Sequence, residues 1–210
     1  MNRLRPLRIA IFASGNGSNA QRIAEYFSEK HIATVALIVS NKTDAYVLER
    51  AKALDIPAYC FSKNQFVEGD DILVLLQKYQ IDFIVLAGFL LLIPRKMIQA
   101  FPNAVINIHP ALLPKFGGKG MYGHHVHEAV IAAKEKESGI TIHYVNEKYD
   151  DGAHILQATC PITENDTPDT LAEKIHRLEY DFLPETIEKV FCHSRKNEKY
   201  FTPLHFGKQL

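Results

Sequence analysis

The chain contains few cysteines and no long apolar run. Its three cysteines, Cys60, Cys160 and Cys192, are widely spaced and include no C-x-x-C pair. An odd number of scattered cysteines is typical of reduced thiols, so we expect a cytoplasmic protein. The longest apolar run, 83–93, is too short to cross a bilayer, and the first residues do not have the pattern of a signal peptide. We therefore expect no membrane partner.

Neither sign of charge is in excess. Lysine plus arginine and aspartate plus glutamate both number 24, which gives a formal net charge of zero. A balanced charge argues against a broad nucleic-acid surface but leaves room for a local phosphate site. The 210 residues, 47% of them hydrophobic, suffice for one domain with a real core. We expect a single domain over residues 1–193 and a C-terminal tail over 194–210.

The motifs of several enzyme classes are absent too. There is no H-E-x-x-H zinc motif and no G-x-S-x-G nucleophile elbow. His124, His125 and His127 cluster at a predicted helix start, but side chains at this spacing diverge and no cysteine is near. We expect no metal site and interpret these histidines as helix-surface or pocket-lining residues.

Short apolar runs alternate with helical patterns through the first two thirds of the chain. Continuous apolar runs are typical of strands covered on both faces, and their alternation with helices predicts a doubly wound α/β fold. After Pro110 two strands are joined by a short link, which suits antiparallel neighbours. We expect a mostly parallel, Rossmann-like sheet with an antiparallel strand near the C-terminus. The predicted strands are 8–13, 35–39, 58–61, 83–87, 105–108, 139–146 and 154–160, and the predicted helices are 18–30, 45–54, 71–79, 94–101, 123–134 and 167–192, the last bent near Pro184.

A glycine-rich loop, Ser14-Gly15-Asn16-Gly17-Ser18-Asn19, separates the first strand from the first helix. Doubly wound proteins bind phosphates here, because glycine permits a close approach and the helix N-terminus offers free N–H groups. We expect Ser18 or Asn19 to cap the helix. Ala20 stands where the dinucleotide fingerprint has its third glycine, so a single phosphate fits better than a pyrophosphate. A tight capped turn without a ligand is the alternative.

The stretch Asn107-Ile108-His109-Pro110 follows an apolar run and ends a predicted strand. Residues two apart in a strand point to the same face, so Asn107 and His109 are expected to project together before Pro110 ends the strand. An amide beside an imidazole is suited to holding a carbonyl and moving a proton.

An acidic turn, Asp150-Asp151-Gly152, lies between the last two strands. One aspartate can cap the turn beside the glycine, which leaves the other free to orient a histidine or a water. The residues alone leave a solvated turn and a catalytic carboxylate equally open. Phe89, Leu90 and Leu92 follow the strand at 83–87, at the end where such sheets bind ligands, and are either core or the lining of an apolar pocket.

Together these features resemble the phosphoribosylglycinamide formyltransferases of purine biosynthesis over about residues 8–190. The loop at 14–19 distinguishes this branch from other 10-formyltetrahydrofolate enzymes. The remaining shared motifs are S-N-K at 40–42, L-A-G-F at 86–89, N-I-H-P-A-L-L-P-K-F at 107–116, Asp150 and Gly152 with I-L-Q at 155–157, and Glu179 shortly before Pro184.

The resemblance implies a formyltransferase fold and a one-carbon transferase. Its co-substrate is 10-formyltetrahydrofolate, and the formyl group passes directly to the amine of glycinamide ribonucleotide, with no covalent enzyme intermediate and no metal. The resemblance leaves open whether the enzyme is a monomer or a homodimer.

The resemblance also implies a role for each matching residue. Asn107 and His109 stabilise the formyl oxygen, and Asp150 orients His109 or a bound water. The phosphate and ribose of the ribonucleotide are bound by Gly17, Ser18, Asn19, His176 and Glu179. The folate is bound by Phe89, Leu90, Leu92 and Asn107.

Three departures from the family pattern concern the folate tail. Leu91 stands where many members have an arginine, the helix at 71–79 lacks another arginine, and a Gly- and Lys-rich segment at 117–122 replaces a compact Gly–His loop. Lys63, Lys115 and Lys119 are the candidates to hold the glutamate tail instead.

Other functions are compatible with parts of the pattern. A formyltetrahydrofolate hydrolase would use the same three catalytic residues, although such enzymes usually have a regulatory domain for which no room exists before Arg8. A formyltransferase acting on initiator tRNA usually has a further barrel and a basic surface. A non-catalytic sugar-phosphate-binding module leaves Asn107, His109 and Asp150 without a role. A nicotinamide dehydrogenase is disfavoured because Ser40 and Asn41 replace the acid that ends its second strand.

Overall fold

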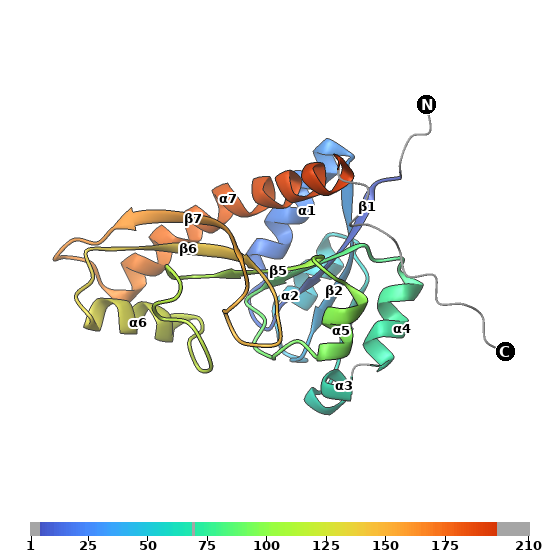
Figure 1. Cartoon of the computed structure of the whole chain (residues 1–210), viewed down its shortest axis with the longest axis horizontal. Coiled ribbons are helices and arrows are strands. Elements are labelled where there is room, and N and C mark those ends of the chain that lie inside the picture. Colours follow the sequence, from blue (N-terminus) through green and yellow to red (C-terminus); the bar gives the residue numbers. More distant parts are fainter. Residues whose placement is uncertain (1–4, 69, 197–210) are drawn as a thin grey trace.

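A seven-stranded sheet forms the centre of the protein (Figure 1). In the computed structural model, which describes residues 5–68 and 70–196, the strand order is β3-β2-β1-β4-β5-β6-β7. The strands are β1 (Leu7–Phe12), β2 (Ala33–Ser40), β3 (Ala58–Cys60), β4 (Phe83–Ala87), β5 (Val105–His109), β6 (Glu137–Tyr144) and β7 (His154–Pro161). Neighbours from β3 to β5 are parallel, whereas β6 is antiparallel to both β5 and β7. The predicted fold class is therefore confirmed.

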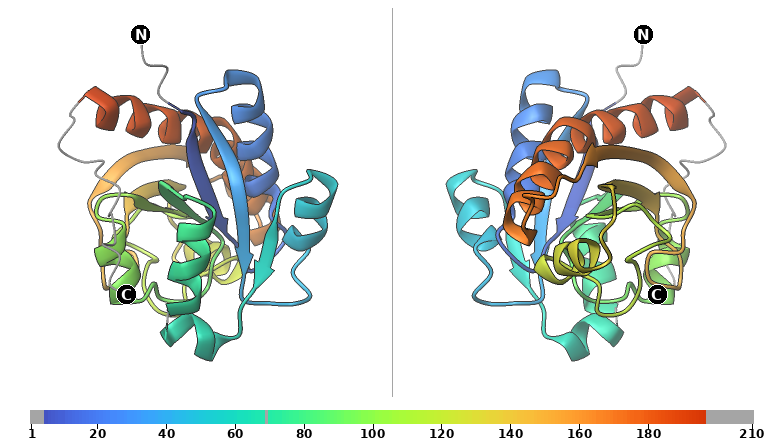
Figure 2. Two further views of the ribbon diagram at one scale, coloured as in Figure 1. Left: turned by 90° about the vertical axis from the view of Figure 1, so that its right-hand side faces the viewer. Right: turned by 90° about the vertical axis from the view of Figure 1, so that its left-hand side faces the viewer.

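Helices cover both faces of the sheet (Figures 1 and 2). They are α1 (Ser18–Lys30), α2 (Val47–Ala53), α3 (Lys63–Glu68), α4 (Asp70–Lys78), α5 (Arg95–Ala100), α6 (His124–Ala132) and α7 (Pro168–Lys196). Buried side chains of α1, α6 and α7 form one apolar cluster with the sheet, and those of α3, α4 and α5 form a second. Two cores on opposite faces explain why the central strands read as continuous apolar runs.

Side chains alternate along β5, so that one face of the strand packs in an apolar core and the other carries the polar groups of the site. Ile106 and Ile108 belong to the cluster that includes α1 and α7. Asn107 and His109 point to the other face, where they pair in register with His143 and Thr141 of β6. This second face therefore becomes polar at β5 and β6, and it provides the floor of the site described below.

The helix α3 was not predicted, although the sequence contains its signal. Ser62 and Gln65 form a reciprocal capping box, with 3.1 Å from Ser62 N to Gln65 Oε1 and 3.3 Å from Gln65 N to Ser62 Oγ. The S-x-x-Q pattern at 62–65 would have identified this helix.

The long helix α7 continues through Pro184 to Lys196. Figure 2 shows that the helix changes direction along its length, as expected where a proline removes a backbone hydrogen bond. The helix thus extends into the predicted tail, and residues 197–210 lie outside the described part of the chain. The domain boundary at residue 193 stays a prediction.

Within residues 5–68 and 70–196, no helix has both the length and the apolar character needed to cross a membrane.

Candidate active site

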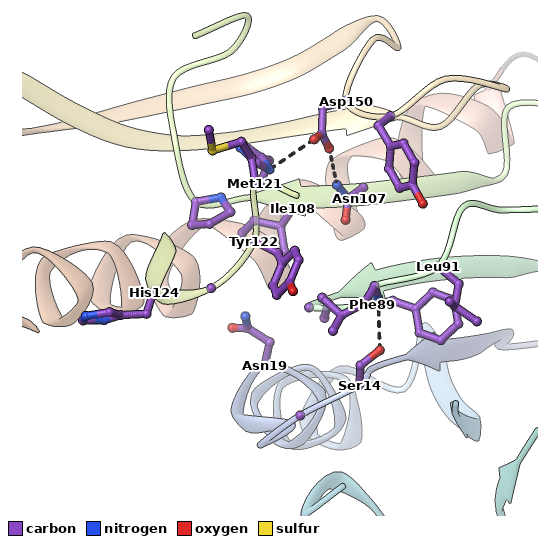
Figure 3. A pocket seen from close by; sticks show the side chains of 18 of the residues that line it. Ser14, Asn19, Phe89, Leu91, Asn107, Ile108, Met121, Tyr122, His124 and Asp150 are labelled. Atoms are coloured by element: carbon purple, nitrogen blue, oxygen red, sulfur yellow. Dashed lines mark hydrogen bonds and ion pairs between the residues drawn. The ribbon is translucent and has the colours of Figure 1, made fainter. Parts of the chain in front are cut away.

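A cavity of about 860 Å³ opens at the carboxyl ends of β1, β4 and β5. This is the edge at which doubly wound sheets bind ligands. Every residue predicted for catalysis or substrate binding lines it, apart from Lys115, one of the lysines considered for the folate tail. They come from the glycine loop, the segment after β4, the end of β5, the turn after β6 and α7 (Figure 3). The structure therefore brings together groups that are distant in sequence, while their individual roles stay predictions.

His109 and Asp150 are neighbours at the floor of the cavity. The distance from His109 Nδ1 to Asp150 Oδ2 is 3.6 Å, and the side chains are only 4% and 11% exposed. His109 Nε2 lies 2.8 Å from the carbonyl oxygen of Phe116. The imidazole is thus held between a carboxylate on one nitrogen and a carbonyl on the other, which fixes the orientation of its ring.

Asn107 completes this group. Its Nδ2 donates to Nε2 of His143 over 3.1 Å. It also donates to Asp150 Oδ1 over 3.4 Å (Figure 3). The bond to Asp150 is the longer and therefore the weaker one. It is the bond that Asn107 can exchange most easily for a bond to a ligand oxygen.

His143 is the residue that the sequence interpretation missed. Its Nδ1 donates to the carbonyl of Tyr144 over 2.9 Å, so its Nε2 is free to accept from Asn107 and lies 3.6 Å from Asp150 Oδ1. A shift in register between β6 and β7 occurs at Ile142/His143, and such bulges often redirect a side chain beside a site. The sequence predicted a strand at 139–146, but the contacts of His143 depend on how that strand is aligned with its neighbours.

The turn after β6 holds Asp150 by backbone geometry. Asp150 has a φ of 52°, and its Oδ2 accepts from the N–H of Gly118 over 2.9 Å. A Cβ atom on Gly152 would lie 1.7 Å from the carbonyl oxygen of Tyr144. Only glycine therefore permits this close turn, and the loop that begins after Phe116 provides its second support.

The pKa values in this group favour an ionised aspartate beside a neutral imidazole. Burial lowers the pKa of His109, against the opposing effects of Asp150 and the Phe116 carbonyl. Burial alone raises the pKa of Asp150. The nearby ring of His143, the electrostatic influence of His109 and the N–H of Gly118 outweigh it and bring that pKa below its ordinary value. His109 can therefore accept a proton near neutral pH with an anion beside it.

The glycine loop is shaped by α2. Gly17 has a φ of 76°, and a Cβ atom there would lie 2.3 Å from Cγ2 of Val47. Arg50 donates from Nε to the carbonyl of Asn16 over 2.9 Å and from Nη2 to Asn16 Oδ1 over 2.8 Å. These contacts leave the first N–H groups of α1 directed at the cavity, because the first residues of a helix have no partner within it.

One local prediction about this loop was wrong. The N-cap of α1 is Gly17, without a side-chain hydrogen bond, rather than Ser18 or Asn19. The helix begins at Ser18 as predicted, directly after the left-handed Gly17, so Ser18 and Asn19 are already helical. Their side chains are thereby free for other contacts.

The side chain of Asn19 contacts α7. Its Nδ2 donates to Oε2 of Glu179 over 2.9 Å, and the same oxygen lies 3.0 Å from Nδ1 of His176. The bond to Glu179 raises the pKa of His176. Three of the residues predicted to bind phosphate and ribose, Asn19, His176 and Glu179, thus form one connected group that lines the cavity.

The segment after β4 supplies the apolar part of the cavity. The ring of Phe89 packs against Phe12 and Phe66, with centroid distances of 5.4 and 5.0 Å. The N–H of Leu90 donates to Ser14 Oγ over 3.0 Å, which ties this segment to the glycine loop. Leu92 is 40% exposed at the rim.

Lysines at the cavity differ in part from those predicted. Lys63 and Lys119 line it, and so does Lys42, which was not singled out. The prediction for Lys115 was wrong: its Nζ pairs with Glu135 over 2.8 Å and borders a different depression.

The histidines at the start of α6 separate as expected. His124 and His127 line the cavity, whereas His125 is exposed and contacts Glu128. Among the described residues, no cluster of three or more histidine, cysteine, aspartate or glutamate side chains is arranged to hold a metal ion.

Comparisons with known proteins agree with this geometry. The profile of the family described as "Formyl transferase" matches residues 7–187. Phosphoribosylglycinamide formyltransferase of Bacillus subtilis is 37% identical over 197 residues, which cover 91% of this chain and 98% of that protein. The chloroplastic enzyme of Arabidopsis thaliana is 41% identical over 194 residues, 90% of this chain, and the chain spans 66% of its length. The chain likewise spans 63% of the chloroplastic enzyme of Vigna unguiculata.

Solved structures agree as well. The crystal structure of phosphoribosylglycinamide formyltransferase from Bacillus halodurans superposes with a TM-score of 0.80 at 38% identity, and the match covers 93% of this chain and all of that one (100%). The profile covers most of the chain, and the Bacillus subtilis enzyme is matched along nearly its whole length. The chain therefore belongs to the formyl transferase family, among the phosphoribosylglycinamide formyltransferases.

Proposed function

We propose that this protein transfers the formyl group of 10-formyltetrahydrofolate to the amine of glycinamide ribonucleotide, a step of de novo purine biosynthesis. The observation that carries the proposal is the meeting of Asn107, His109 and Asp150 in one cavity with the glycine loop. Its volume of about 860 Å³ lies in the range of sites that enclose ligands of this size. A family relationship and a site with matching chemistry support the same activity.

The reaction requires little from the enzyme beyond positioning of the two substrates and proton transfer. The substrate amine attacks the formyl carbon, a new C–N bond forms, and negative charge develops on the formyl oxygen. Asn107 donates to that oxygen in place of its 3.4 Å bond to Asp150, and His109, neutral at the start, becomes the second donor once it has taken a proton from the attacking amine. The bond between the formyl carbon and N10 of the folate then breaks, and a proton from the attacking amine ends on that nitrogen.

Asp150 favours the transfer of a proton to His109. It stabilises the imidazolium form of His109 across 3.6 Å, a distance that also admits a bridging water after a small movement. No covalent intermediate is needed for this sequence. Cys160 is buried away from the cavity, and neither Cys60 nor Cys192 lines it.

The substrates occupy the two ends of the cavity. Gly17, Ser18 and Asn19 hold the phosphate at the helix N-terminus, Glu179 binds ribose hydroxyls, and His176, with its raised pKa, adds a positive charge near the phosphate. The pterin packs against Phe89, Leu90 and Leu92. Lys42, Lys63 and Lys119 are the cations available for the glutamate tail, since Leu91 cannot replace an arginine there.

The enzyme acts as a monomer or a homodimer on these two small substrates, and we place it in the cytoplasm on the basis of its cysteines. Two relatives are named chloroplastic, so the compartment differs within the family.

The direct test measures consumption of 10-formyltetrahydrofolate with and without glycinamide ribonucleotide. We expect turnover only when both are present, together with formation of the formylated ribonucleotide. Equal turnover without the ribonucleotide would identify a formyltetrahydrofolate hydrolase. Binding of sugar phosphates without any turnover would leave a non-catalytic binding module.

A further inference from the structure

One buried imidazole in the cavity wall has an unused nitrogen. His127 on α6 is 4% exposed, and its Nδ1 has no hydrogen-bond partner among the described residues. A buried polar atom without a partner is unfavourable, and native proteins contain few of them. Because His127 also lines the cavity, a ligand is the partner that the structure leaves room for.

The charge state of His127 suits contact with a neutral group. Burial lowers its pKa to about 4, His176, His124 and His109 act in the same direction, and Glu179 opposes them. At neutral pH the ring is therefore uncharged, with one N–H donor and one acceptor. Such a ring is poorly suited to a phosphate and well suited to a hydroxyl.

Two other atoms in the same part of the cavity also lack partners within the described chain. Asn19 Oδ1 is buried without a hydrogen bond. Glu179 uses Oε2 for both Asn19 and His176, and its Oε1 forms no hydrogen bond with the described residues. These two oxygens accept only, so a ligand that satisfies them must bring protons of its own.

A pair of sugar hydroxyls meets this requirement. Each hydroxyl carries one proton to donate and two lone pairs to accept with. A hydroxyl that donates to Glu179 or Asn19 can at the same time accept from the N–H of a neutral imidazole. The three unused atoms thus form a set that matches a vicinal diol rather than an anion.

We propose that Nδ1 of His127 donates to a ribose hydroxyl of the ribonucleotide substrate, next to Glu179. The assignment rests on the proposed function, because that function supplies the ribose. His127 is then a binding residue that selects for the sugar and takes no part in the proton transfers at His109.

Other unpartnered buried hydroxyls provide a contrast. Thr186 Oγ1 on α7 has no hydrogen-bond partner within the described chain and is 2% exposed, yet Thr186 does not line the cavity. Replacing Thr186 with valine removes the polar atom with almost no change of shape. It is therefore a matched control for an unpartnered atom that has no ligand.

The test compares the wild type with His127→Leu, His127→Asn and Thr186→Val. For each we would measure the KM of both substrates, kcat, and the change in Tm on adding ribose 5-phosphate. His127→Leu should fold with an unchanged or higher Tm, because an unpartnered polar group is gone, while the KM for glycinamide ribonucleotide rises about tenfold. The KM for the folate should stay within about twofold, and the Tm shift by ribose 5-phosphate should be clearly smaller than in the wild type, as a tenfold weaker affinity requires. His127→Asn, which keeps a donor, should restore much of the affinity, and Thr186→Val should change neither KM.

Three results would overturn the assignment. The first is a normal KM for the ribonucleotide and a normal ribose 5-phosphate shift in His127→Leu. The second is an equal rise in both KM values, which would indicate general distortion of the cavity. The third is a wild type that ribose 5-phosphate does not stabilise.

If the wild type lacks ribonucleotide-dependent turnover, the proposed function itself fails. If the wild type is active, and His127→Leu has a normal KM for the ribonucleotide and a normal ribose 5-phosphate shift, only the role of His127 fails.

Discussion

The Nδ1 atom of His109 lies 3.6 Å from the Oδ2 atom of Asp150, although the two residues belong to a strand end and a distant turn. Both side chains are almost fully buried, so the pair is shielded from the screening that weakens ion pairs at the surface. The pair is the centre of the chemistry proposed for this protein, and the first two predictions below concern this pair and the groups beside it.

Removing either member of this pair should abolish most of the activity. We expect His109→Ala and Asp150→Asn each to lower kcat at least about 100-fold, since a donor to the developing oxyanion or the group that stabilises it is lost. Steady-state kinetics with both substrates measures the effect, and circular dichroism checks that the variants are folded. Near-normal rates in folded variants would remove these residues from the mechanism.

His143 should act through Asn107. His143→Phe removes the acceptor that holds the Asn107 amide, so we expect kcat to fall about 10- to 100-fold while both KM values change little. His143→Gln keeps an acceptor oxygen and should retain more activity than the phenylalanine variant. Identical losses in the two variants would show that packing, rather than the hydrogen bond, sets the effect.

Ribonucleotide affinity should depend on Asn19. Asn19→Ala removes a side chain at the phosphate loop and releases Oε2 of Glu179 from its 2.9 Å bond. We expect the KM for glycinamide ribonucleotide to rise about tenfold with a smaller change in kcat, and Ser18→Ala to act in the same direction. A change confined to the KM of the folate would mean that the phosphate binds elsewhere.

The shape of the glycine loop should be sensitive to a single methyl group. Gly17→Ala places a Cβ 2.3 Å from Val47 and forces a left-handed conformation on alanine, so we expect a loss of about 2–5 kcal/mol in the free energy of unfolding. Gly15→Ala is the control for stability, because a Cβ there meets no atom within 4 Å. Urea denaturation compares the two, and equal stabilities would show that α2 can move away from the loop.

Acid should destabilise the fold partly through His127. In the unfolded chain a histidine binds its proton near pH 6.5, whereas folded His127 does so only near pH 4. Between these values the unfolded state binds more protons, so the stability contributed at neutral pH is lost as the pH falls through this range. Asp150, with its lowered pKa, adds a loss of stability below about pH 4.

The measurement is the free energy of unfolding in urea at several pH values between 4.5 and 7. The wild type should lose stability toward the acid end, and His127→Leu should show a shallower decline. Identical slopes would mean that folded His127 titrates at an ordinary pKa.

The sequence revealed the parallel half of the fold more fully than the site. The apolar runs predicted the sheet, and the N-I-H-P segment correctly placed Asn107 and His109 on one face. His143 was missed because its contact with Asn107 depends on strand register, which one chain without its partner strand does not display. Lys115 was misplaced because its ion pair with Glu135 depends on how two distant segments pack together, which residue types alone do not display. The cap of α1 was misjudged because Gly17 takes a conformation that favours glycine itself over a polar cap.

The strict alternation of side-chain direction along β5 limits the insertions and deletions that this protein can tolerate. Deleting or inserting one residue between Val105 and His109 would turn Ile106 and Ile108 toward the cavity and bury the amide and the imidazole among hydrocarbon. A substitution at a single position cannot restore the original direction of all these side chains. Homologues should therefore differ in length at the loop from Gly117 to Gly123, which has open space around several of its glycines, and keep a constant number of residues in this strand.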